Sequence, residues 1–116
     1  MPAELSEDER KILLQVARQA ITAAVQRQPQ PELDWGELPP VLQAPGVCFV
    51  TLTTEGELRG CIGALEAYQS LVEDVREHAA AAALEDYRFL PVQPDELPGL
   101  QIEISRLTAP VPLPYG

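Results

Sequence analysis

The residues with the greatest chemical potential are six consecutive ones, Leu58 to Gly63, in which a cysteine stands among glycines. Gly60 and Gly63 flank Cys61, so its sulfur could be open and the nearby backbone N–H groups could stabilise an oxyanion. Arg59 is close enough in sequence to favour a thiolate. The pattern is compatible with a nucleophilic or redox-active Cys61. The alternative is that Cys61 is a small buried side chain, as many cysteines are.

The single histidine and an acidic pair further along are weaker candidates. His78 falls within a predicted helix, where a general base could be mounted, but a lone histidine there is more often a surface or a hydrogen-bonded core residue. Glu85 and Asp86 could act as paired catalytic carboxylates. Alternatively, Asp86 and Arg88 bond each other and the backbone in the turn that ends the helix. The turn explains these residues with fewer assumptions.

The chain has too few cysteine and histidine residues for the usual metal centres built from them. Cys48 and Cys61 lack the spacing of zinc ligands, and two thiols cannot hold an iron–sulfur cluster. We therefore expect no structural zinc, no iron–sulfur cluster and no other cofactor.

Cys61 belongs to a predicted β-hairpin. Residues 47–53 are rich in β-branched and aromatic side chains, as strands are. Residues 54–56 resemble a three-residue loop that Gly56 closes, and residues 57–64 form the return strand.

The glycines and cysteines of this hairpin carry two further predictions. Gly60 and Gly63 indicate a bulge or a close backbone approach. A three-residue loop places Cys48 and Cys61 on opposite faces of the sheet, whereas a two- or four-residue loop places them diagonally on one face. Diagonal neighbours lie ~7–8 Å apart, so neither register brings the thiols within disulfide reach.

Two amphipathic helices are predicted around the hairpin. Ser6 and Glu9 form a capping-box pair ahead of an apolar stripe, and Pro29 stops that helix. A second helix is expected from Ser70 to about Leu84.

Irregular segments and one last strand complete the pattern. The proline-rich residues 29–46 predict an extended connection, which Trp35 and Leu38 are expected to pin to the domain. Residues 100–105 alternate apolar and polar side chains, as a half-buried strand does, and residues 110–116 show no element. The order helix, hairpin, helix, strand predicts one α+β domain over residues 1–116, with a mainly antiparallel sheet.

Size and charge restrict the function classes. The chain has 116 residues, 46% of them hydrophobic, which suits one globular domain. Its 18 acidic and 8 basic residues give a net charge of −10, which opposes binding to a nucleic-acid backbone. No apolar run reaches the ~20 residues of a membrane helix, and the acidic N-terminus does not suit a signal peptide. We expect a cytoplasmic domain that binds neither nucleic acid nor membrane.

These residues resemble the AMMECR family, named for the AMME-syndrome candidate region and called protein A of the AmmeMemoRadiSam system in prokaryotes. The family signature Leu-Arg-Gly-Cys-Ile-Gly matches residues 58–63 without a change, and the preceding strand matches at residues 46–52. Residues 86–89 resemble the family's Asp-Pro-Arg-Phe turn, with Tyr87 in place of proline. The resemblance covers about residues 6–113.

The resemblance implies an α+β domain and possible partners, but no reaction. Prokaryotic members are associated with a Memo-like protein and a radical-SAM protein, which implies a shared pathway. Family members usually continue well beyond the last residue of this chain, so we expect the C-terminal part of the family to be absent here. A second copy could then cover an exposed apolar face, giving a homo-oligomer.

Two hypotheses compete for residues 59–63. In the first, this segment is a docking or small-molecule contact surface, and Cys61 is only small and buried. The residues assigned to binding are Gly60, Ile62, Gly63, Asp86 and Arg88. In the second, Cys61 is a nucleophile or redox thiol that Arg59 and the flanking N–H groups support. We prefer binding because the sequence identifies no base for Cys61.

Overall fold

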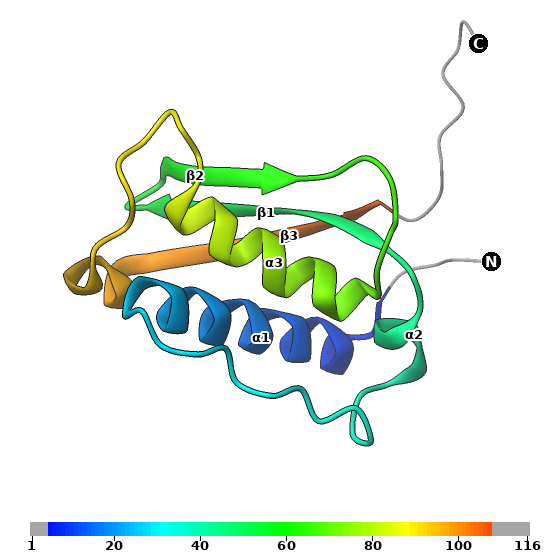
Figure 1. Cartoon of the computed structure of the whole chain (residues 1–116). Coiled ribbons are helices and arrows are strands. Elements are labelled where there is room, and N and C mark those ends of the chain that lie inside the picture. Colours follow the sequence, from blue (N-terminus) through cyan, green and yellow to red (C-terminus); the bar gives the residue numbers. More distant parts are fainter. Residues whose placement is uncertain (1–4, 108–116) are drawn as a thin grey trace, which may run out of the picture.

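The computed structural model describes residues 5–107, and its elements form an α+β domain. In chain order they are α1 (Glu7–Val25), α2 (Pro40–Gln43), β1 (Val47–Thr54), β2 (Glu57–Gly63), α3 (Leu71–Leu84), the 3-10 helix η1 (Pro94–Gly99) and β3 (Leu100–Leu107). The strands form an antiparallel sheet in the order β2-β1-β3, so β1 is its middle strand. Helices α1 and α3 lie side by side against one face of this sheet (Figure 1). The predicted fold class is confirmed.

Helix α1 begins at the predicted capping box. The Ser6 hydroxyl accepts the Glu9 N–H at 3.1 Å, and the Glu9 carboxylate accepts the Ser6 N–H at 2.7 Å, which satisfies two donors that the first turn leaves unpaired. The apolar stripe of α1 is buried against α3 and the sheet, and its innermost members are Leu13, Ala17, Ala20 and Ile21. Because two of these are alanines, α3 can approach α1 closely.

The β1–β2 hairpin differs from the predicted loop. Its turn has two residues, Glu55 and Gly56, and both have positive φ values, 53° and 83°. This backbone conformation matches the twist of the strands, and glycine adopts it without strain. Apolar alternation carries no information on loop length, so the sequence alone did not distinguish the two loops.

Shortly after the turn, a β-bulge shifts the pairing register of β1 and β2 by one residue. Thr53 pairs with Leu58, but Leu52 pairs with Gly60, so Arg59 is the extra residue of the bulge. Beyond it, Cys61 lies opposite Thr51. Because of the bulge, the two cysteines lie on opposite faces of the sheet even though the loop has two residues. Both are free, in agreement with the prediction that no register brings the thiols within disulfide reach.

The connection between α1 and β1 is less extended than predicted. It contains the short helix α2, in which Pro40 occupies a first-turn position that needs no N–H donor. Leu42 of this helix is fully buried, whereas the Trp35 side chain is 42% exposed. Leu42 therefore anchors the connection, and Leu38 packs against the core as predicted, whereas the expected anchoring role of Trp35 is wrong.

Among residues 5–107, no helix combines the length and the apolar character needed to cross a bilayer. The prediction of no element at residues 110–116 lies outside the described residues.

Both glycines of β2 allow the close approaches that the sequence predicted. A Cβ atom at Gly60 would fall well inside van der Waals contact of the Ala82 carbonyl oxygen in α3. At Gly63 it would overlap the ring of Phe49. Gly60 therefore fixes how closely α3 packs on the sheet.

We predict that Gly60→Ala lowers the free energy of unfolding by about 1–3 kcal/mol, because α3 must move away from β2. Gly99→Ala is the matched control, since a Cβ atom there meets nothing within 4 Å. Its effect should stay within about 0.5 kcal/mol. Urea unfolding of both variants measures the difference, and equal losses would contradict the packing argument.

Candidate functional site

The pleat of the sheet separates the two cysteines into two environments. Cys48 points with Val50 toward the helices, and both side chains are fully buried. Cys61 lies opposite Thr51 on the other face, and both side chains are partly exposed. Each cysteine therefore marks a separate candidate site.

The first site is the outer edge of β2 at Cys61, where Asp86 and Arg88 bind the strand backbone. The Cys61 N–H donates to Asp86 Oδ2 at 3.0 Å, and Arg88 Nη2 donates to the Cys61 carbonyl at 3.4 Å. Arg88 and Asp86 also form an ion pair at 2.6 Å. The pair thus occupies the backbone groups that another strand would need in order to pair with β2 here.

The ion pair also determines the protonation of Asp86. The Asp86 carboxylate accepts hydrogen bonds from the Arg88 side chain, the Cys61 N–H and the Arg88 N–H. Above all, the bonds from the Arg88 side chain hold the pKa of Asp86 well below its usual range. These contacts match the turn that the sequence favoured over a pair of catalytic carboxylates.

The contacts of Cys61 bear directly on its proposed chemistry. Its Sγ atom lies 3.2 Å from the Thr51 hydroxyl. Its N–H is already donated to Asp86 and is not available to an oxyanion. The structure brings no histidine to it, because the only one, His78, lies on the helix side of the sheet.

Arg59 fastens the bulge of β2 to the segment that follows α3. Its guanidinium donates to both carboxylate oxygens of Glu96 at 2.8 and 3.1 Å, and to the Leu90 carbonyl at 2.9 Å. These bonds lower the pKa of Glu96. The guanidinium expected to support a Cys61 thiolate is therefore engaged by a carboxylate.

The other predicted binding residues have packing roles. Gly60 lies against the backbone of α3, Ile62 packs on the core, and Gly63 lies beneath the Phe49 ring. Asp86 is nearly buried, so Arg88 offers the most accessible side chain of the predicted set, 47% exposed.

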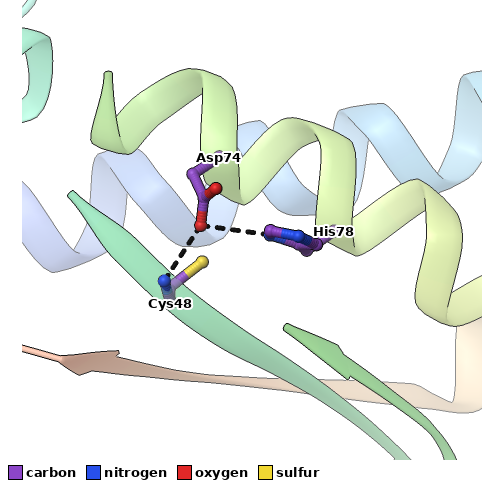
Figure 2. A group of neighbouring side chains, drawn as sticks. All are labelled: Cys48, Asp74 and His78. Carbon is purple, nitrogen blue, oxygen red and sulfur yellow. Dashed lines mark hydrogen bonds and ion pairs between the residues drawn. The ribbon is translucent and has the colours of Figure 1, made fainter. Parts of the chain in front are cut away.

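The second site is a buried group of Cys48, Asp74 and His78 between β1 and α3 (Figure 2). Asp74 Oδ2 accepts the Cys48 N–H at 2.9 Å and lies 3.1 Å from His78 Nδ1. Asp74 Oδ1 accepts the side-chain amide of Gln69 at 3.3 Å. Burial, and secondarily Asp74, raises the pKa of the Cys48 thiol far above its usual range.

From the sequence, neither Cys48 nor Asp74 was assigned to a functional site. The sequence did contain a signal for this cluster. Asp74 and His78 are four residues apart, so they lie on one face of α3, next to the apolar stripe that includes Val75. Two polar side chains on a buried stripe need partners. That Cys48 is the third member follows only from the packing of α3 on β1.

Comparisons with known proteins identify relatives of this chain. The AMMECR1 family model matches residues 14–115. A protein of Methanothermobacter thermautotrophicus is 41% identical over 111 residues, which make up 96% of this chain and 57% of that protein. A protein of Saccharolobus solfataricus is 38% identical over 112 residues, which make up 92% of this chain and 48% of the relative.

A solved structure shares this fold. An uncharacterized protein from Pyrococcus horikoshii matches with a TM-score of 0.84 and 32% identity, over 91% of this chain and 54% of that one. The chain therefore spans about half the length of the relatives that it matches.

We predict that Asp86→Asn destabilises the fold by about 1–3 kcal/mol at pH 7, because the variant loses the ion pair at the β2 edge. Since the pKa of Asp86 is depressed in the folded state, its stabilisation is present above the unfolded value of ~3.9. It is lost as the pH falls through the folded value.

The difference between wild type and Asp86→Asn should therefore shrink steadily below pH ~4, as followed by urea unfolding at several pH values. Asp34→Asn, at an exposed carboxylate, serves as the control and should change stability little at any pH. A difference that grows on acidification would refute the assigned role of Asp86.

Proposed function

We propose that this chain, which belongs to the AMMECR1 family, is a protein-binding module that acts through the edge of β2. The contact surface consists of Tyr87, Arg88 and Leu90, which we call the β2-edge surface. The observation that carries the proposal is the exposure of two large apolar side chains there, 95% for Tyr87 and 82% for Leu90. Surface aromatic and arginine residues of this kind are typical of interface anchors.

Contacts with the strand hold the β2-edge surface in place. Asp86 and Arg88 bind both backbone groups of Cys61, and Arg59 binds the Leu90 carbonyl. The Arg88 guanidinium also lies 5.5 Å from the centre of the Phe89 ring. A surface ordered before binding loses less conformational entropy when a partner docks.

The family resemblance suggests which partners to test. Prokaryotic members of the AMMECR family are associated with a Memo-like protein and a radical-SAM protein. We propose that one of them docks on the β2-edge surface in a shared pathway. The net charge of −10 would favour a partner with a basic rim around its docking site.

The competing proposal is a cysteine-dependent enzyme that uses Cys61. Its support is the position of the sulfur on the open face of the sheet, 3.2 Å from the Thr51 hydroxyl. The occupied N–H of Cys61 and the Glu96-bound Arg59 favour binding over catalysis. Reactivity of the thiol separates the two proposals.

We expect Tyr87→Ser and Leu90→Ser each to weaken partner binding at least ~10-fold, since truncation of an anchor costs more than about 1.4 kcal/mol. Calorimetric titration against the purified Memo-like and radical-SAM proteins of the same genome measures the effect. Leu14→Ser is the matched control because Leu14 is also an exposed leucine, 40% exposed, but lies on α1. The proposal fails if neither protein binds, or if all three variants bind alike.

Alkylation read separately at each cysteine tests the choice between binding and catalysis. As a packing residue beside the interface, Cys61 should react slowly at neutral pH, and more slowly still in the complex. Cys48 should resist until denaturant is added, because it is fully buried and its pKa is raised. Fast alkylation of Cys61 at neutral pH would instead favour the enzyme.

A further inference from the structure

We propose that Cys48, Asp74 and His78 form a binding site for one divalent transition-metal ion, with Zn²⁺ as the ion that best fits their donor atoms (Figure 2). The site is independent of the β2-edge surface, because Cys48 faces the helices and Cys61 faces away from them. The ion would join the middle strand β1 to helix α3.

The geometry needs little adjustment to hold a metal ion. One sulfur, one carboxylate oxygen and one imidazole nitrogen all lie within 4.8 Å of one another. Around a tetrahedral Zn²⁺, with bonds of ~2.0–2.3 Å, such ligand atoms would be about 3.3–3.8 Å apart. Side-chain rotations that move the donors by about 1 Å close this gap.

The donor types suit zinc better than the hard cations. Thiolate and imidazole select borderline and soft ions, whereas Mg²⁺ and Ca²⁺ prefer oxygen ligands throughout. Three protein ligands leave one tetrahedral position for a water molecule.

Charge balance adds to the geometric argument for a bound cation. The ionised thiol of Cys48 and the carboxylate of Asp74 together carry two negative charges, which a divalent ion neutralises. A metal ion would displace the thiol proton on binding and hold both donors at one positive centre.

Surrounding contacts already orient the carboxylate. The Cys48 N–H and the Gln69 side-chain amide donate to its two oxygens, as the outer contacts of metal ligands commonly do. The His78 side chain is 7% exposed and the Asp74 side chain is fully buried, so an ion would enter past the histidine.

Burial also argues against the other chemistry that these three residue types support. A cysteine, a histidine and a carboxylate can form a nucleophilic triad. Cys48, however, is fully buried, and a substrate could not reach its sulfur without separating α3 from the sheet. A small ion has no such requirement, so the cluster is better suited to binding a metal ion than to nucleophilic catalysis.

The test is a titration of metal-stripped protein with Co²⁺, which reports thiolate ligation through a sulfur-to-cobalt charge-transfer band. Because the chain has only two cysteines, Cys61→Ala leaves Cys48 as its single thiol. We expect this variant to develop the full band at one equivalent of Co²⁺, and Zn²⁺ to abolish it by displacement. This result assigns the ligand without a variant at the buried position.

Two further variants complete the design. Cys48→Ala should lack the band, and His78→Gln should weaken Co²⁺ binding by more than the ~10–100-fold that loss of an outer-shell contact costs. Zn²⁺ should raise the thermal midpoint of wild type and of Cys61→Ala, but not that of Cys48→Ala.

The proposal is overturned if Cys61→Ala shows no charge-transfer band at saturating Co²⁺. It is equally overturned if Co²⁺ binds without a thiolate band, since surface carboxylates would then explain the binding. Retention of the band in Cys48→Ala would assign it to Cys61 and also reject the site.

Discussion

Two backbone N–H groups that the three-stranded sheet leaves unpaired determine how α3 and the following turn are placed. β2 ends at Gly63, opposite Phe49, so it offers no partner to the Cys48 N–H, and Asp74 of α3 accepts it. The outward N–H of Cys61 is accepted in the same way by Asp86, just after α3. Because an unpaired buried N–H is costly, these two carboxylates fix both ends of α3 against the sheet. Both candidate sites follow from this arrangement.

The bulge at Arg59 determines which side chains of β2 point to each face of the sheet. In the register of the turn, Cys61 would lie opposite Val50 and point into the core, because a shift of one residue reverses every side chain. The bulge places it opposite Thr51 instead, and turns Gly60 toward α3. The same residue that reverses Cys61 also ties β2 to Glu96. Strand geometry, rather than an activated thiol, therefore explains the position of Arg59.

The sequence was sufficient for features that are encoded locally. The Ser6 capping box, the apolar stripe of α3 and the close approach at Gly60 were all predictable, since each depends on a short pattern. Loop length and the exact position of the bulge that the glycines indicated were not, because alternation looks the same on both sides of a one-residue insertion. The buried cluster was missed for a different reason. Cysteine and histidine alone are too few for a metal centre in this chain, whereas the cluster also contains a carboxylate, and only tertiary packing brings Cys48 to α3.

The two carboxylates differ in how their charge is balanced, and this difference separates the roles of the sites. Asp86 is paired with Arg88, a permanent cation, so its charge is compensated and the adjacent surface is left to its apolar side chains. The hydrogen-bond partners of Asp74 are an imidazole, an amide and a backbone N–H, and none of these is a permanent cation. The sulfur of Cys48 lies within 4.8 Å of this carboxylate and supplies no positive charge either. A divalent ion would compensate the charge at Asp74, as Arg88 already does at Asp86.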